Sequence, residues 1–453
     1  MSERTVAAIA TAQGQSALGV IRISGDKALE VADKVFFPFS QKKLVDIKGY
    51  TAAYGQVKDG DSVIDDGVAL VFRGPNSFTG EDTVEITLHG GAIILRDTLR
   101  LILEKGAFPA EAGEFTKRAF LNGKTDLTRA ESIMGLISAE SEAQLKLSRA
   151  AHLGKTAEKI EGIITALTKA DAAISVFSDY PDEDIDGLDR ESFSKMLKNA
   201  KTDLEIMLKD YDAGKILREG IETAIVGKPN VGKSSLMNML SRADRSIVTD
   251  IAGTTRDVIE ETVRLGDIIL RLADTAGIRE TGDQIESIGV ELALKRMETA
   301  QLILAVFDGS QDLDSDDLRL LENLKGKNAL IIINKTDLDS RLGREIFKGF
   351  NLVEISAKEN EGLESLKDKI AEISGVNNIC PDSANLINER QRACAKRALD
   401  AIDEAYTAIL SGQTLDAVGI CVDDALSSLF ELTGRRVTNE VADEIFRSFC
   451  GVK

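Results

Sequence analysis

The spacing of hydrophobic residues changes three times along the chain. Residues 1–118 alternate short runs typical of β-strands, such as VAAIAT, GVIRISG and TVEITL, with turn clusters such as GPNSFTGED. This alternation predicts an α/β domain. In residues 119–217 apolar positions recur at spacings of three and four, which predicts long helices, for instance over TRAESIMGLISAESEAQLKLSRAAH and FSKMLKNAKTDLEIMLKDYDAG.

Residues 218–378 return to strand patterns, now as fully apolar runs. TAIVG, IILRLAD, LILAVFD, ALIIIN and LVEIS alternate with helical segments, which predicts a doubly wound, mainly parallel sheet. Residues 379–453 are helical again, over ANLINERQRACAKRALDAIDEAYTAIL and DALSSLFELTGRRVTNEVADEIFRSF. Because helix precedes and follows the α/β segment, we expect an insertion into one helical domain. The predicted fold class is therefore α/β and all-α, in several domains.

Composition limits the ligands and metals that the chain is expected to bind. The chain has 453 residues and a formal charge of −19, which argues against broad binding to a phosphate backbone. Its two histidines, His89 and His152, and four scattered cysteines make a histidine or thiolate metal site hard to build, so any metal should be oxygen-bound. The opening MSERTVAAIATAQG lacks a signal-peptide pattern and no apolar run could cross a bilayer, so we expect a cytoplasmic protein.

A phosphate-binding loop follows the strand TAIVG. The stretch GKPNVGKSS fits the pattern GxxxxGK[ST] and leads into the helical run SLMNMLS, which is the context that this motif requires. Lys233 would neutralise the β and γ oxygens of a nucleotide, and the Ser234 hydroxyl could ligate Mg²⁺.

The base is indicated by two further motifs. In NKTD, which follows ALIIIN, the carboxylate of Asp337 can accept two hydrogen bonds from guanine, a donor pair that adenine lacks, and SAK after LVEIS would complete the pocket. The nucleotide is therefore predicted to be GTP. The residues expected to contact it in these motifs and in the phosphate loop are Asn230, Val231, Gly232, Lys233, Ser234, Ser235, Asn334, Lys335, Thr336, Asp337, Ser356, Ala357 and Lys358.

Two switch-like stretches, TDIAGTTRD and DTAG, lie between these motifs. Thr255 is the candidate second ligand to Mg²⁺, and Asp274 is the candidate outer-shell carboxylate. Ile278 occupies the position of the glutamine that orients the attacking water in Ras-type GTPases, and an alkyl group cannot do so. The GTP contacts expected from the two stretches are Thr249, Asp250, Ile251, Ala252, Gly253, Thr254, Thr255, Asp274, Thr275, Ala276 and Gly277.

Several uncommon stretches outside the GTPase motifs carry a resemblance. They are ALGVIRISG, GPNSFTGED, GEFTKRAFLNGKTDL, FSDYPDEDID and a terminal Phe-Cys segment. With them the chain resembles, over essentially its whole length, the MnmE (TrmE) family of bacterial tRNA-modifying GTPases. The resemblance implies four segments: a folate-binding and dimerisation domain over 1–118, a helical domain in two parts over 119–217 and 379–453, and an inserted Ras-like G domain over 218–378.

The resemblance also implies how hydrolysis proceeds without a glutamine. A potassium ion, bound by Asn230, Thr249, Ile251 and Thr254, would supply the charge that an arginine finger gives elsewhere. Glu286 would orient the water when two G domains close on each other, and Asn230 and Lys233 would act with it. The alternatives are that Asn230 only shapes its loop and that Glu286 is an exposed helix residue.

For the two ends of the chain the resemblance implies a tetrahydrofolate site. Arg22, Glu85 and Lys124 are the matching positions, where Glu85 could pair with the donor edge of a pterin; the alternative is that Arg22 and Lys124 form ordinary salt bridges. The family ends in Cys-x-Gly-Lys, whereas this chain ends in Cys-Gly-Val-Lys, in which the cysteine and the terminal Lys453 keep their positions. Cys450 is therefore either a catalytic thiol or a small buried residue.

The function implied is that of a homodimer that modifies tRNA. With MnmG, a partner that uses FAD and NADH, it would install a carboxymethylaminomethyl or aminomethyl group at C5 of the wobble uridine. The carbon would come from methylene-tetrahydrofolate. The site would bind either this compound or 5-formyl-tetrahydrofolate. Two alternatives remain: a ribosome-assembly or translation GTPase that acts as a binding switch, and an oligomerising mechanical GTPase, against which the lack of a membrane-binding segment counts.

Overall fold

Two sets of residues in the computed structural model pack as separate units. The first unit contains Met1–Met134, Ala151–Asp203 and Asn388–Lys453, and the second contains Gly135–Ala150 and Leu204–Ile387. The predicted division into four domains stays a prediction. The structure describes residues 4–12, 14–179, 190–243, 261–272, 297–376, 383–437, 442 and 445–446.

A seven-stranded sheet forms the N-terminal part, in the order β3-β4-β5-β6-β2-β1-β7. All neighbours are antiparallel except β1 and β7, which are parallel. The strands are β1 (Val6–Ile9), β2 (Leu18–Ser24), β3 (Phe36–Pro38), β4 (Thr51–Asp59), β5 (Ser62–Phe72), β6 (Thr83–His89) and β7 (Phe108–Pro109).

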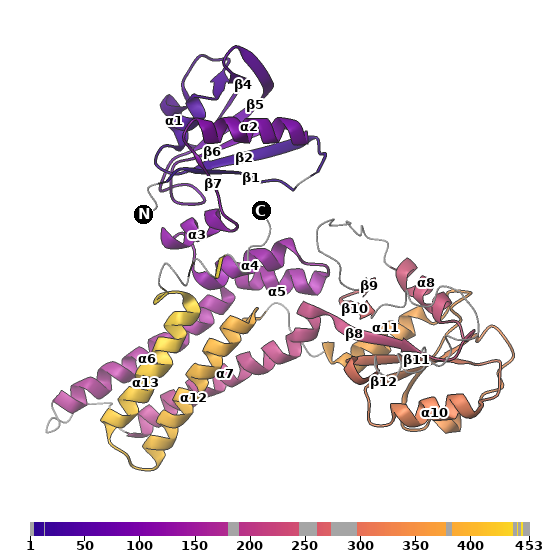
Figure 1. Cartoon of the computed structure of the whole chain (residues 1–453). Coiled ribbons are helices and arrows are strands. Elements are labelled where there is room, and N and C mark those ends of the chain that lie inside the picture. Colours follow the sequence, from indigo (N-terminus) through magenta and orange to yellow (C-terminus); the bar gives the residue numbers. More distant parts are fainter. Residues whose placement is uncertain are drawn as a thin grey trace. The chain divides into compact units, whose positions relative to one another are not determined.

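One face of this sheet packs against two helices. Helices α1 (Ala28–Asp33) and α2 (Ala92–Glu104) pack on the strands (Figure 1), and alternate residues of the strands, such as Ile21, Ile23 and Ile86, are fully buried with them in one core. This is the period-two pattern of a sheet with one buried face. The other alternate positions form an outer face on which Tyr54 is exposed.

Helices make up most of the rest of the first unit. Helix α13 packs against α12 and α6, and small buried residues such as Ala398, Ala405 and Ala425 allow a close approach. Among the described helices, none is long and apolar enough to cross a membrane. The bounds of these and the neighbouring helices are α3 (Glu114–Leu121), α4 (Leu127–Ile137), α5 (Glu142–His152), α6 (Lys155–Asp179), α7 (Arg190–Glu219), α12 (Glu389–Leu410) and α13 (Leu415–Thr433), with a short 3₁₀ helix η1 (Leu44–Asp46) in the N-terminal part. Most of α5 and the later part of α7 belong to the second unit.

The second unit contains a six-stranded sheet in the order β13-β12-β11-β8-β10-β9. Its strands are parallel except β9, which forms an antiparallel hairpin with β10. The strands and helices are β8 (Ile221–Val226), α8 (Lys233–Ala243), β9 (Glu261–Leu265), β10 (Ile268–Leu272), β11 (Leu302–Asp308), α10 (Ser315–Leu324), β12 (Ala329–Asn334), η3 (Arg344–Phe347), β13 (Asn351–Glu354) and α11 (Leu363–Ser374).

Helices cover both faces of this sheet. Leu304 and Val306 of β11 pack in one cluster with α8 and α11, whereas Ala305 and Phe307 pack in another with α10. A strand buried on both faces needs an unbroken apolar sequence, which is why LILAVFD has no polar position before its last residue. The predicted doubly wound sheet, inserted between helical segments, is confirmed.

Three of the predicted helices differ from the observed helices in where they begin or end. The stretch 128–152 is two helices, α4 and α5, because Ser141 starts a new helix by accepting a hydrogen bond from the Gln144 amide (3.2 Å). Helix α12 starts only after Asn388, which caps it. Helix α13 starts at Leu415 and stops before Gly434, whose positive φ of 88° ends the helix within the predicted run.

Candidate functional site

The phosphate loop begins where β8 ends, beside β11. A Cβ at Gly227 would lie 2.4 Å from the carbonyl oxygen of Val306, so only glycine allows this approach. Positive φ values at Gly227 (150°), Asn230 (64°) and Gly232 (99°) turn the backbone before α8 begins at Lys233. The sequence thus forms the loop-to-helix turn that presents amide groups to an anion.

Lys233 lies inside this loop. Its ammonium donates to the carbonyl oxygens of Gly227 (2.7 Å) and Lys228 (2.6 Å). Burial lowers the pKa of Lys233, since a cation loses hydration there. An anionic phosphate beside the ammonium would offset that loss, which makes the loop a fitting site for phosphate.

Asn334 joins the phosphate loop to the base loop. It is 2% exposed at the end of β12, where its side-chain amide donates to the Val231 carbonyl oxygen (2.9 Å) and accepts from the Ala357 amide (3.0 Å). A Cβ at Gly232 would lie 2.1 Å from Asn334 Nδ2, so the glycine leaves room for this contact. The three predicted motifs therefore meet at one side chain.

Asp337 is presented to solvent at the edge of this arrangement. Ser356 Oγ donates to its carboxylate (2.7 Å), and this hydrogen bond is the main cause that lowers the pKa of Asp337. Ser356 is itself buried and paired with Glu361 by backbone hydrogen bonds, so the serine is fixed. An ionised, oriented carboxylate is what recognition of the guanine donor edge requires.

The other described candidates lie around the same loops. Asn230, Ser234 and Ser235 are exposed at the phosphate side, and Thr336 and Lys358 are exposed at the base side. The predicted residues that lie outside the described residues are Thr249, Asp250, Ile251, Ala252, Gly253, Thr254, Thr255, Asp274, Thr275, Ala276, Gly277, Ile278, Glu286, Cys450 and Lys453.

Two of the folate candidates are paired with each other. Arg22 of β2 lies opposite Glu85 of β6, and its guanidinium contacts Glu85 Oε1 through Nε (2.8 Å) and Nη2 (2.7 Å). The same guanidinium lies over the rings of Phe78 and Phe115, at 5.3 and 5.2 Å. The pair is about a quarter exposed, so it can still be reached by a ligand.

Lys124, the third folate candidate, lies against the loop 74–82. Its ammonium donates to the Pro75 carbonyl oxygen (2.9 Å), and the neighbouring Asn122 amide donates to the Thr79 carbonyl oxygen (2.7 Å). Gly80 lies close to the Lys124 stem. The stretches GPNSFTGED and GEFTKRAFLNGKTDL, which carried the family resemblance, are thus neighbours in space.

Sequence reasoning missed the residue that joins these stretches most firmly. Arg118 is only 3% exposed and donates to Glu81 Oε2 (2.9 Å) and Glu114 Oε1 (2.6 Å). An arginine inside the quoted stretch was visible, but nothing local indicated its burial. Phe78 and Phe115, which flank Arg22, were missed for the same reason.

Comparisons with known proteins agree over nearly the whole chain. The model of the MnmE helical domain matches residues 127–450, and that of the GTP-binding protein TrmE N-terminus matches residues 5–124. A tRNA modification GTPase MnmE from Alkaliphilus oremlandii (strain OhILAs) is 41% identical, and one from Clostridioides difficile (strain 630) is 40% identical, each over 98% of both chains.

Among solved structures, the G domain of the T. maritima FeoB iron transporter is 29% identical over 34% of this chain and 99% of that one, with a TM-score of 0.26. Both domain models and both relatives give the same result: the chain belongs to the MnmE family of tRNA modification GTPases.

Proposed function

We propose that the chain is a potassium-stimulated GTPase that, with MnmG, modifies C5 of the wobble uridine of tRNA in the cytoplasm. The group installed is carboxymethylaminomethyl or aminomethyl, with methylene-tetrahydrofolate as the carbon donor. The observation that supports this most is the double hydrogen bonding of Asn334, which joins a phosphate loop to a base loop that ends in the ionised Asp337. The negative charge of the chain fits a role in which MnmG supplies the positive surface for tRNA.

The described residues of the phosphate loop include side chains that suit magnesium and potassium. Ser234 and Asn230 carry hard side-chain oxygens, and both are exposed at the phosphate loop. Magnesium would be held by Ser234 and Thr255, and potassium by Asn230 with the oxygens of 249–254; both ions would offset phosphate charge. Lys233 would neutralise the β and γ oxygens, and Glu286 would orient the water.

GTP turnover in potassium and in sodium at equal ionic strength tests this proposal. We expect strong stimulation by potassium in the wild type and its loss in Asn230→Ala. Asn238→Ala is the matched control, because Asn238 is an exposed asparagine on α8 outside the loop, and it should keep the stimulation. Equal rates of the wild type in both salts would refute the potassium mechanism.

Folate binding is proposed at the Arg22–Glu85 pair, with Lys124 beside the same loop. A titration of the full chain with 5-formyl-tetrahydrofolate should show binding that is weakened in Glu85→Gln and unchanged in Glu30→Gln, an exposed residue of α1. Intact GTP turnover without any folate binding would favour the binding-switch GTPase instead.

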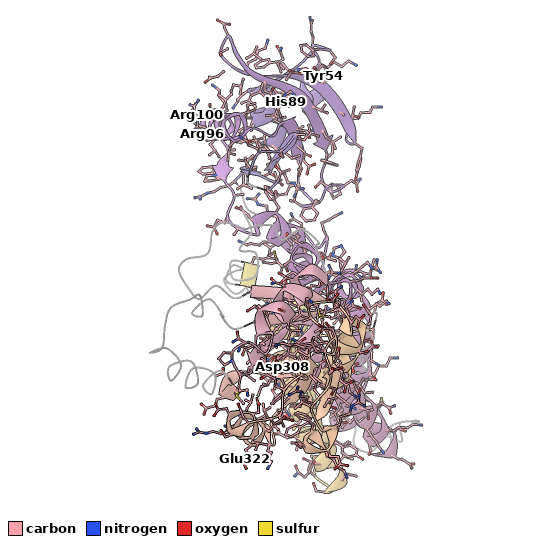
Figure 2. The ribbon with its side chains drawn as sticks, turned by 90° about the vertical axis from the view of Figure 1, so that its right-hand side faces the viewer. Tyr54, His89, Arg96, Arg100, Asp308 and Glu322 are labelled. Carbon is pink, nitrogen blue, oxygen red and sulfur yellow. The ribbon has the colours of Figure 1, made fainter. Side chains whose placement is uncertain are left out.

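Homodimerisation is proposed through the outer face of the N-terminal sheet. Phe39 and Tyr54 expose 55% and 58% of their surface there with their rings 5.1 Å apart, and Val68 lies opposite Tyr54 on the next strand. Figure 2 shows Tyr54 on the N-terminal part. Exposed aromatic pairs of this kind are typical of interfaces. Tyr54→Asp should shift the sedimentation equilibrium to monomer, and a dimer of unchanged stability would refute this face.

A further inference from the structure

One segment of the G domain contacts both nucleotide loops through carboxylates. This bridging segment, Asp308–Asp317, runs from the end of β11 to the first turn of α10. Three of its carboxylates, those of Asp308, Asp314 and Asp317, bind lysines of the two loops. Figure 2 labels the first of them, Asp308, in the second unit.

The phosphate loop is held through Lys228. Its ammonium contacts Asp314 Oδ2 (2.6 Å) and Asp317 Oδ2 (2.7 Å), and the Asp317 side chain is only 6% exposed. The carbonyl of Lys228 is one of the two that accept from the Lys233 ammonium. Fixing the Lys228 side chain therefore fixes backbone that surrounds the phosphate-binding lysine.

The base loop is held through Lys335. Its ammonium contacts Asp308 Oδ2 (2.6 Å), and the Asp308 side chain is 8% exposed. Lys335 has a φ of 67°, which is uncommon for a residue with a side chain, and the ion pair offsets that cost. Lys335 stands between Asn334 and the rest of the guanine motif, so the pair also fixes the start of the base loop.

Hydrogen bonds hold both ends of the bridging segment. Asp308 Oδ1 accepts from the amide (3.0 Å) and hydroxyl (2.7 Å) of Ser310, and the Gly309 amide donates to the Asn334 carbonyl oxygen (2.8 Å). At the other end Asp314 and Asp317 form a reciprocal capping box at the start of α10. Both ends of the bridging segment are therefore held in place, one against the base loop and the other at the start of α10.

We propose that the bridging segment positions the phosphate loop and the base loop as one body, so that damage to one loop's anchor weakens the nucleotide contacts of both. This inference rests on the proposed GTP binding. Lys228, Asp308, Asp314 and Asp317 are positioning residues, since they act through the loops. The consequence is that Lys228 and Asp308, which bind different partners, depend on each other energetically.

A double-mutant cycle tests the inference. Affinity for a fluorescent GDP analogue is measured for the full-length wild type, Lys228→Met, Asp308→Asn and the double variant. Each single change should weaken binding about tenfold, the equivalent of about 1.4 kcal/mol. Because the second change disturbs a body that the first has already loosened, the double variant should lose only about tenfold to twentyfold, whereas independent sites would multiply to about a hundredfold.

Three controls separate positioning from simple destabilisation. Lys228→Arg keeps the charge and should rescue binding to within about threefold. Asp316→Asn changes an exposed carboxylate of the same helical turn that, among the described residues, pairs with neither lysine, and it should leave affinity unchanged. If Lys228→Met does not fold, Asp317→Asn replaces it, since an asparagine can still accept the capping hydrogen bond.

The outcomes are distinct. Losses that multiply, or an affinity unchanged in Lys228→Met, would overturn the bridge while leaving GTP binding intact. A wild type that does not bind the GDP analogue would overturn the proposed function itself.

Discussion

Gly232→Ala is the sharpest single test of the nucleotide site. An added Cβ would lie 2.1 Å from Asn334 Nδ2, and the backbone there has a φ of 99° that an alanine rarely adopts. Asn334 cannot swing aside at low cost, because it is buried and its amide is bonded at both ends, to the Val231 carbonyl oxygen and the Ala357 amide. The substitution therefore acts on both loops at once.

The magnitude follows from these contacts. Loss of two hydrogen bonds costs about 1 to 3 kcal/mol. Backbone strain at a residue with positive φ adds about 1 to 3 kcal/mol. We therefore expect Gly232→Ala to lower the free energy of unfolding of the G domain by about 2 to 6 kcal/mol. GDP affinity should fall at least about tenfold, since the loop that binds phosphate is displaced.

Urea denaturation followed by far-ultraviolet circular dichroism measures the first quantity, because the chain contains no tryptophan to report fluorescence. The transition of the G domain is the one that moves to higher urea when GDP is added. Gly162→Ala in α6 is the control: its Cβ meets nothing within 4 Å, and alanine should stabilise that helix by up to about 1 kcal/mol. A Gly232→Ala protein that unfolds within about 0.5 kcal/mol of the wild type and binds GDP within twofold would refute the reasoning.

Three further predictions concern groups outside the nucleotide site. Glu131→Ala should cost about 3 to 5 kcal/mol in urea denaturation, because it removes the buried carboxylate that binds the largely covered Arg390 guanidinium in a bidentate pair; a loss below about 1 kcal/mol would contradict this. The hydrogen bond to Asp65 raises the pKa of His89, so the pair stabilises the fold below pH ~6.5 and that stabilisation is lost as pH rises through the folded-state pKa. In an NMR titration Asp65→Asn should lower the His89 pKa, and an unchanged value would show that Asp65 is not the cause. Burial raises the pKa of Cys394 to about 11, so mass spectrometry should find it unalkylated at pH ~8 in the native protein and alkylated in urea.

The sequence predicted elements whose burial is uniform and missed boundaries that depend on a single cap or on a distant contact. LILAVFD and ALIIIN correspond to β11 and β12 residue for residue, since a strand covered on both faces tolerates no polar interruption. The break between α4 and α5 was missed because it depends on the cap by Ser141. At Gly434 an added Cβ would lie 2.7 Å from the Phe120 ring, a contact that periodicity cannot reveal.

For the candidate site, too, local patterns were predictive and contacts between distant segments were not. Motif spacing predicted that Asn334, Asp337 and Ser356 lie close together, and they do so because the carboxyl ends of parallel strands meet at one edge of the sheet. Ion pairs between distant segments left no local signal. Arg22 and Glu85 are 63 residues apart, and Lys228 and Asp314 are 86 apart, so only the folded register of the strands and loops brings each pair together.

The two carboxylates proposed to bind guanine and a pterin are oriented by different kinds of neighbour. Asp337 is oriented by a neutral hydroxyl, which leaves its negative charge for the two donors of guanine. Glu85 is oriented by Arg22, so the formal charges cancel and the pair offers an acceptor beside a row of donors. A ligand that only donates suits the first arrangement, whereas a folate, with a pterin donor edge and an anionic tail, suits the second. Under the proposed function, a carboxylate thus selects two different ligands in one chain, because its neighbours determine what remains available for binding.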